Sequence, residues 1–126
     1  MLKKYRLWLD DVRPIPEWME NSNCIWYNNA ETMIANMDRL NRLFSLDDIE
    51  FISLDNDLGE GRIEGYKVLD WLESLQIPIN FGIHIHTSNP VARERMRAII
   101  RRNGWKEILC AIIMKANLPE PLRPPS

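Results

Sequence analysis

The sequence predicts an α/β domain in which parallel strands form one layered sheet. Short apolar runs typical of strands alternate with segments whose apolar residues recur at helical spacing. Several of these runs end in aspartate, asparagine or histidine, as strands that lead into a ligand site often do. The 126 residues are enough for one domain with its own core, and we find no internal repeat.

The first predicted strand covers residues 5–10, and a short second strand covers 25–27. Residues 11–23 hold Pro14, Pro16 and a cluster of Asn and Ser, which favours a loop. Parallel strands are usually joined by a helical crossover of about a dozen residues. Because this link barely reaches that length and shows no helical pattern, we expect the first helix to be reduced to a loop.

The middle of the chain predicts two helices around a central strand. Residues 30–44 have helical spacing, and residues 49–54 are apolar on both faces apart from Ser53, as in a central parallel strand. A loop with two glycines then leads into a second helix over 65–75, and Pro78 ends it.

The last part of the chain predicts two strands and one helix. Residues 81–86 form the fourth strand, and the next helix has Asn89 as N-cap and Pro90 at its first position. Residues 108–114 are the predicted fifth strand. We expect residues 1–116 to form a single domain and residues 117–126, which include four prolines, to form a tail.

Composition excludes several classes of protein. The net charge of −2 argues against bulk binding of DNA or of an anionic membrane surface. No segment approaches the roughly 20 apolar residues that a membrane span needs, and the N-terminus is too polar for a signal peptide. Cys24 and Cys110 are expected to be reduced thiols. These features predict a cytoplasmic protein without a membrane partner.

Four carboxylates are predicted to gather at one edge of the sheet. Asp10 and Asp11 follow the first strand, whereas Asp55 and Asp57 follow the third. Like charges about 5 Å apart repel by roughly 3 kcal/mol at an effective dielectric near 20. A cation among them would remove this cost, and oxygen ligands suit Mg²⁺ or Mn²⁺. The alternative is turn and cap chemistry, above all for Asp11.

Two histidines end the fourth strand. His84 and His86 are two residues apart and therefore point to the same face. His86, at the strand end, is the better candidate for an acid or base near neutral pH. His84 lies deeper, where it either contacts the substrate or is a core histidine.

Candidate phosphate contacts lie beside these groups. Thr87 and Ser88 offer hydroxyls, and Asn89 offers an amide unless its N-cap role occupies it fully. The N-terminus of the following helix favours anions. Arg13 and Arg62, on loops beside the acidic edge, are better candidates for binding a phosphate than the arginines of that helix, which we interpret as a solvated face.

The tryptophans are dispersed along the chain. Trp8, Trp26 and Trp71 are predicted to pack in the core. Trp18 is a candidate for stacking a base, although nothing in its local sequence requires that role.

Four motifs, taken in order, resemble the cyclic-phosphate-processing receiver family. They are Leu7–Pro14, Ser53–Gly59, Gly65–Leu69 and His86–Pro90, and they cover the chain from about Leu7 to Met96. The resemblance implies a flavodoxin-like, receiver-like fold with strand order 2-1-3-4-5.

The resemblance also implies roles for single residues. Asp10 and Asp11 match the acidic pair that holds Mg²⁺ in receivers, and Asp55 or Asp57 matches the phosphoryl acceptor. Thr87 falls near the receiver hydroxyl position, and Lys115 resembles the receiver lysine, which would contact the phosphate. The histidine-to-asparagine motif and the missing first helix depart from ordinary receivers and argue against phosphorelay signalling.

Our leading hypothesis is a metal-dependent phosphoric-ester hydrolase that acts on a phosphorylated small molecule or an RNA end. A 2′,3′-cyclic phosphate at an RNA end and a cyclic nucleotide are the candidate substrates. Asp10, Asp11, Asp55 and Asp57 are the candidate metal ligands, and His86 would transfer protons. The predicted catalytic residues are His86, Asp55 and Asp57.

The sequence also bears on two other functions. The chain could be a receiver-like signalling module, or one that binds a nucleotide or partner, phosphorylated on Asp57 or Asp55. Metal-free phosphodiesterase chemistry with two His-x-Thr/Ser motifs does not fit, because His86-Thr87-Ser88 supplies a single motif and the chain has just two histidines.

Overall fold

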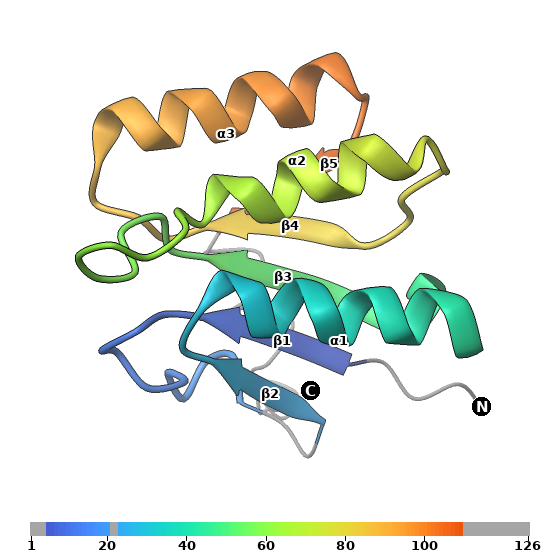
Figure 1. The fold of residues 1–126 in the computed structure, drawn as a ribbon, viewed down its shortest axis with the longest axis horizontal. Coiled ribbons are helices and arrows are strands. Elements are labelled where there is room, and N and C mark those ends of the chain that lie inside the picture. Colours follow the sequence, from blue (N-terminus) through green and yellow to red (C-terminus); the bar gives the residue numbers. More distant parts are fainter. Residues whose placement is uncertain (1–4, 21–22, 110–126) are drawn as a thin grey trace, which may run out of the picture.

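A computed structural model describes residues 5–20 and 23–109 of the chain. Its five strands form one parallel sheet in the order β2-β1-β3-β4-β5 (Figure 1). This confirms the predicted fold class and strand order. The strands are β1 (Tyr5–Leu9), β2 (Cys24–Tyr27), β3 (Ile49–Leu54), β4 (Gly82–Ile85) and β5 (Lys106–Glu107).

Three α-helices connect these strands: α1 (Ala30–Leu43), α2 (Tyr66–Leu75) and α3 (Pro90–Arg102). A short 3₁₀ helix, Leu46–Asp48, precedes β3. The side chain of Asn89 accepts the N–H groups of the first turn of α3, with Pro90 at the first helical position. The predicted start of this helix is therefore confirmed.

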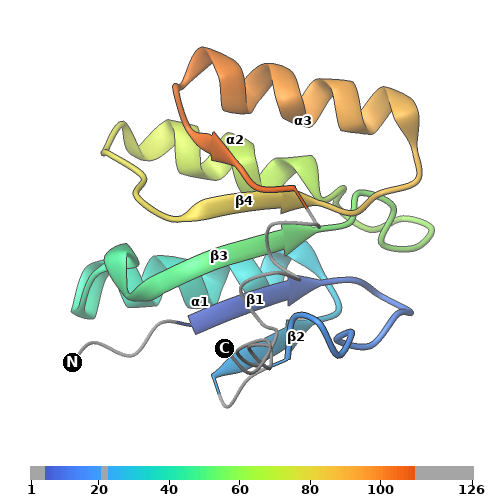
Figure 2. The ribbon, with the colours of Figure 1, turned by 180° about the vertical axis from the view of Figure 1, so that it is seen from behind.

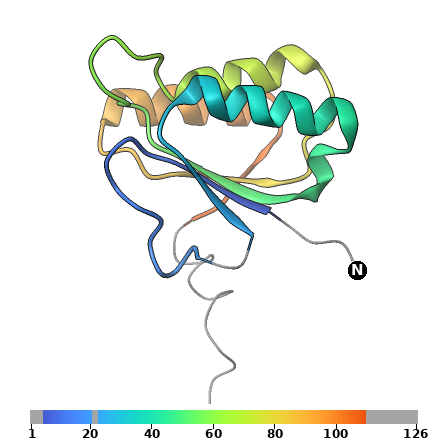
Figure 3. The ribbon, with the colours of Figure 1, turned by 60° about the horizontal axis from the view of Figure 1, so that its bottom comes forward.

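All three helices lie on the same face of the sheet (Figure 3). Alternate strand residues point to this face, and they build the main core with the apolar stripes of the helices. Fully buried members include Leu9, Ile52, Leu69, Ile83 and Met96. Seen from behind in Figure 2, α1 lies beyond β1 and β3.

The opposite face is covered differently. In the described part of the chain, the segment 11–20 packs on it, and Met19 is fully buried against Trp8 and Phe51. This segment contains turns and bends but no helix, as predicted for the link after β1. None of the described helices covers this face, and it carries the polar side chains of Ser53 and His84, which are both buried.

The position predicted for the fifth strand was wrong. The fifth strand was placed at 108–114, but β5 covers Lys106–Glu107; Ile108 and Leu109 are not in a strand, and 110–114 lie outside the described residues. The left-handed turn at Gly104, with φ +67°, ends α3 and brings the chain directly beside β4. The prediction relied on the apolar composition of 108–114 and therefore placed the strand too late in the chain.

Trp26 does not lie in the core. Its side chain is 44% exposed because β2 is an edge strand, and its indole N–H donates to the carbonyl of Asp10 at 2.7 Å. Trp8 is buried as predicted, and Trp71 packs at the margin of the core.

Within 5–20 and 23–109, none of the helices is both long and apolar enough to cross a bilayer. Cys110 and the predicted tail, 117–126, lie outside the described residues. The domain boundary at residue 116 stays a prediction.

Candidate functional site

Two carboxylates and one imidazole meet at the carboxyl-terminal edge of the sheet. Asp10 follows β1, Asp55 follows β3 and His86 follows β4, and these three strands are neighbours. One ligand atom from each residue lies within 4.8 Å of the other two. Among the described residues, this is the one group of three or more such side chains that could share a metal ion. We call it the Asp–Asp–His cluster.

Asp10 is held by its own loop. The backbone N–H groups of Val12 and Arg13 donate to its Oδ1 at 2.9 and 2.7 Å. Its Oδ2 lies 3.0 Å from Nε2 of His86 and 3.3 Å from Nε of Arg13. These partners suit an ionised carboxylate, so Oδ1 fixes the side chain and Oδ2 faces the cluster.

Asp55 is buried at the end of β3. Burial raises the pKa of its carboxyl, although the N–H of Asn56, Arg13 and the hydroxyl of Thr87 act in the opposite direction. The raised pKa means that the charged form is poorly stabilised by the protein alone, and a cation would stabilise it. Gly65 allows this packing, because a Cβ there would lie 1.8 Å from the Asp55 carbonyl oxygen.

Both ring nitrogens of His86 have partners. Nε2 faces Asp10, and Nδ1 lies 2.7 Å from the hydroxyl of Ser53. The ring also stacks on Trp8, with centroids 3.8 Å apart and an interplanar angle of 6°. Burial lowers the pKa of His86, while Asp10 opposes this shift. The imidazole is therefore neutral near pH 7 and fixed in orientation.

His84 shares the Ser53 hydroxyl with His86. Its Nδ1 lies 2.6 Å from Ser53 Oγ, so the two histidines face one group, as their spacing predicted. Burial lowers the pKa of His84 to about 4. This ring is also neutral near pH 7.

The Ser53 hydroxyl has one proton, so it can donate to only one of the two histidine rings and must accept from the other. This requirement fixes the tautomers of both rings. With Asp10 ionised, Nε2 of His86 carries the proton that it donates to Oδ2, so Nδ1 is an acceptor. Ser53 then donates to His86 Nδ1 and must accept from Nδ1–H of His84. It follows that Nε2 of His84 carries no proton.

The chain also matches a known family. The model of the cyclic-phosphate processing receiver domain matches residues 5–102, which is most of the chain. The chain belongs to this family. No curated protein and no solved structure is similar enough to it to count as a match. The membership confirms the resemblance on which the site prediction was partly based, and it links this receiver domain to cyclic phosphates.

The receiver domain brings some of the predicted site residues together. Asp10, Asp55 and His86 form the cluster, and Arg13 and Thr87 contact it. Arg13 is more than half exposed, whereas Thr87 is fully buried and is held by the Arg93 guanidinium, which donates to its carbonyl.

Other predicted residues lie outside the cluster. Asp11 and Asp57 do not belong to it; Asp57 is exposed, and its Oδ2 accepts from Asn89 Nδ2 at 3.5 Å. Asn89 is engaged as the N-cap, and Ser88 is exposed. Lys115 lies outside the described residues. The roles assigned to all of these residues from the sequence stay predictions.

Sequence reasoning missed two residues that organise the site. Ser53 was noted as the one polar residue of a buried strand, and this was a usable signal, because period-two alternation places it on the same face as a neighbouring histidine. Trp8 was assigned to the core, and nothing in its local sequence indicated that its ring would stack on His86.

A pocket of about 440 Å³ adjoins the cluster on the face of the sheet opposite α1, α2 and α3. We call it the aromatic pocket. Its lining consists of Trp8, Arg13, Pro14, Pro16, Trp18, His84 and His86. Arg13 and His86 therefore belong both to its wall and to the surroundings of Asp10.

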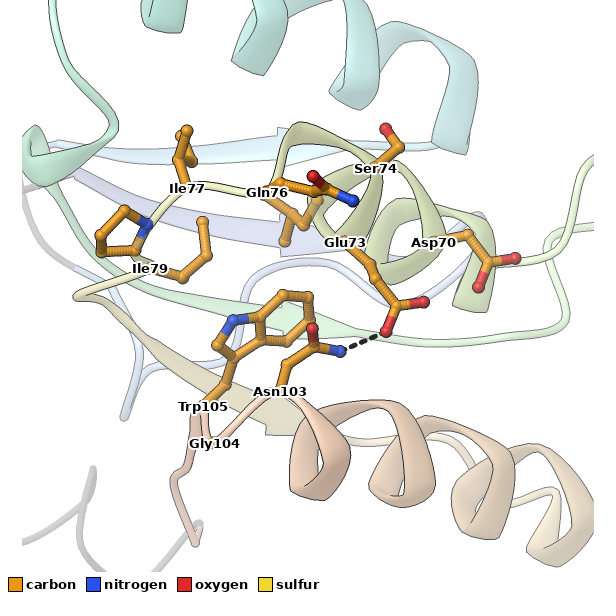
Figure 4. A pocket seen from close by; sticks show the side chains of 11 residues that line it. Asp70, Glu73, Ser74, Gln76, Ile77, Ile79, Asn103, Gly104 and Trp105 are labelled. Atoms are coloured by element: carbon orange, nitrogen blue, oxygen red, sulfur yellow. Dashed lines mark hydrogen bonds between the residues drawn. The ribbon is translucent and has the colours of Figure 1, made fainter.

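A larger pocket, of about 1000 Å³, lies elsewhere on the receiver domain, between the end of α2 and the end of α3 (Figure 4). Its carboxylate Glu73 pairs with Arg102 at 2.6 Å and accepts from Asn103 at 2.5 Å. These partners hold the pKa of Glu73 well below its usual range. With its charge satisfied and no histidine in the lining, this pocket offers no comparable chemistry.

Proposed function

We propose that the chain is a metal-dependent enzyme that processes phosphate esters, with a cyclic phosphate of a nucleotide or an RNA end as substrate. The observation that carries the proposal is the convergence of Asp10, Asp55 and His86 at the ligand-binding edge of the sheet. The family membership supports the cyclic-phosphate part of it.

The donor set fits a divalent cation. Asp10 Oδ2 and an oxygen of Asp55 are the carboxylate ligands, and His86 Nε2 is the imidazole ligand. Metal-bound histidines usually have their second nitrogen held by a hydrogen bond, and Ser53 occupies that position. This arrangement favours a ligand role for His86 over the proton-transfer role that the sequence suggested. An imidazole ligand also favours Mn²⁺ over Mg²⁺.

A cation bound there would neutralise phosphate charge and lower the pKa of a coordinated water. The residues around it would orient the substrate. Arg13 is exposed and paired with Asp10, so its guanidinium can turn to a phosphate oxygen when the cation takes over the Asp10 charge. The N-terminus of α3 supplies a positive dipole end on the same edge.

Turnover assays test this function. The panel comprises 2′,3′-cyclic nucleotides and an RNA oligonucleotide that ends in a 2′,3′-cyclic phosphate, each with Mn²⁺ and with Mg²⁺. We expect hydrolysis by the wild type and loss of at least about 100-fold in rate for Asp10→Asn. The matched control is Asp70→Asn, which changes an aspartate beside the larger pocket and should retain the rate.

The proposal fails if the wild type hydrolyses none of these esters with either metal, or if Asp10→Asn is as fast as the wild type while its circular dichroism is unchanged.

A signalling role is the second candidate, and the position of Asp55 favours it. This aspartate directly follows the central strand β3, beside Asp10, as the resemblance to receivers implies for a phosphoryl acceptor. Incubation with acetyl phosphate and Mg²⁺, followed by intact-mass measurement, separates the two candidates. A gain of one phosphoryl group that Asp55→Asn abolishes would favour signalling.

A further inference from the structure

The aromatic pocket offers a binding site beside the metal cluster. We infer that it holds the base of a nucleotide whose phosphate lies at the Asp–Asp–His cluster. The inference rests on the proposed function for the position of the phosphate. The evidence for the base site itself consists of the pocket walls, one nitrogen of His84, and the position of His86 and Arg13 between pocket and cluster.

The walls of the pocket are flat rings. Trp18 meets Trp8 edge-on, with centroids 6.2 Å apart, and meets His84 edge-on at 5.3 Å. Pro14 and Pro16 add apolar surface to the lining. Aromatic walls bind planar heterocycles by stacking, which contributes about 1–3 kcal/mol per base in proteins that bind single-stranded nucleic acids.

One polar atom of a buried lining residue has no hydrogen-bond partner among the described residues. His84 is 6% exposed, and its Nδ1 is engaged with Ser53. Its Nε2 makes no hydrogen bond to any residue in 5–20 or 23–109. Buried polar atoms are nearly always satisfied, so this nitrogen calls for a ligand group. The edges of nucleobases carry both N–H donors and nitrogen or carbonyl acceptors, so a base can bond to this nitrogen in either tautomer of the ring.

The pocket and the cluster adjoin each other through His86, which belongs to both. His86 lines the pocket with its ring and faces Asp10 with its Nε2, 3.0 Å from Oδ2. Arg13 lines the pocket and lies 3.3 Å from the same oxygen. A ligand that fills both places has a flat heterocycle at one end and an anionic group at the other. The volume of about 440 Å³ is in the range of small-molecule sites.

Isothermal titration calorimetry with three probes tests the inference: adenosine, 3′-AMP and ribose 5-phosphate. We expect 3′-AMP to bind at least ten times more tightly than ribose 5-phosphate in Mn²⁺. Adenosine should still bind when EDTA removes the metal. A 3′-phosphorylated trinucleotide, added as a fourth probe, shows whether an RNA end is preferred to a free nucleotide.

Two variants locate the base. Trp18→Leu should weaken 3′-AMP binding by about 5- to 150-fold, the equivalent of one stacked base. His84→Asn keeps a polar atom near Ser53 but removes Nε2, and should weaken adenosine and 3′-AMP without changing ribose 5-phosphate. Trp105→Leu, at the larger pocket, is the matched control and should bind all probes as the wild type does.

Equal affinity for 3′-AMP and ribose 5-phosphate, or wild-type affinity for adenosine in both pocket variants, would overturn the inference. Its failure can be told from failure of the proposed function. If adenosine binds through Trp18 but no ester is hydrolysed, the function is wrong and the base site remains. If glycerol 1,2-cyclic phosphate is hydrolysed with the same kcat/KM as a cyclic nucleotide, the base site is wrong.

Discussion

The imidazole of His86 lies flat on the indole of Trp8, with ring centroids 3.8 Å apart. The contact follows from the sheet register, which pairs Trp8 with Ser53 and Ser53 with His84 across β1, β3 and β4. On the face opposite the helices, this register fixes four side chains beside one another: Trp8, Ser53, His84 and His86. The orientation of His86 is set by this row before any ligand binds, which is the preorganisation that a metal ligand needs.

Removing the Ser53 hydroxyl should weaken metal binding, although Ser53 is not itself a metal ligand. Ser53→Ala leaves Nδ1 of both histidines without a partner in a buried place, which should lower the free energy of unfolding by about 1–3 kcal/mol. Loss of the group that holds a metal-bound histidine should reduce Mn²⁺ affinity by about 10- to 100-fold. Urea unfolding and calorimetry measure the two effects.

The control for this change is Ser74→Ala. Ser74 is exposed, donates to the carbonyl of Trp71 and lines the larger pocket. The Ser74→Ala substitution should leave Mn²⁺ affinity unchanged. Wild-type affinity in Ser53→Ala would show that the hydroxyl does not support the metal site.

Asp55 and Asp57 should differ sharply when each is changed to asparagine. The sequence could not separate them, but Asp55 belongs to the cluster and Asp57 is exposed outside it. Asp55→Asn should reduce Mn²⁺ affinity by at least about 100-fold, because it removes a charged ligand, whereas Asp57→Asn should change it by less than about threefold. Calorimetry measures the Mn²⁺ affinity of both variants. A larger loss of affinity in Asp57→Asn than in Asp55→Asn would place the metal at Asp57.

Metal binding should reverse the tautomers of both histidines. Without metal, His86 carries its proton on Nε2 and His84 on Nδ1. A metal at His86 Nε2 moves that ring's proton to Nδ1, so Ser53 must donate to His84, whose proton then moves to Nε2. Because the chain has two histidines, long-range ¹⁵N–¹H spectra with a diamagnetic ion such as Zn²⁺ resolve them.

In that experiment both histidines of the wild type should change tautomer together when the metal binds. In Ser53→Ala the tautomer of His84 should no longer follow that of His86. A change at His86 with none at His84 in the wild type would contradict the shared role of Ser53.

Acid should destabilise the metal-free protein through its buried histidines. The pKa of His84 is lowered from 6.5 to about 4, so between these values the unfolded chain takes up a proton that the folded chain does not. The free energy of unfolding should therefore fall as pH drops from about 6.5 to 4. The raised pKa of Asp55 has the opposite sign, because the folded state takes up that proton first.

Urea titrations in EDTA from pH 7.5 to 4.5 measure this dependence. His84→Asn should flatten the curve in part, since His86 remains. An equally steep curve in the variant would show that His84 contributes nothing to it.

Much of the fold followed from local patterns. Asn89 with Pro90 marked the start of α3, and the missing helical period after β1 marked the loop that replaces a helix. Apolar composition alone could not place β5, whose position depends on the turn at Gly104 and on pairing with β4.

The candidate site was predicted less completely. Strand order placed Asp10, Asp55 and His86 at one edge, because the ends of neighbouring parallel strands are fixed by the topology. The choice between Asp55 and Asp57 depends on where the chain leaves the sheet, and the stack on Trp8 depends on register across three strands. Neither feature can be predicted from the spacing of residues along the chain.

A crystal grown with Mn²⁺ tests the central claim most directly, through an anomalous difference map collected near the manganese edge. The account predicts one strong peak within about 2.0–2.3 Å of Asp10 Oδ2, an Asp55 oxygen and His86 Nε2. A map with no peak at these atoms, or with its peak at Asp11 or Asp57 instead, would contradict it.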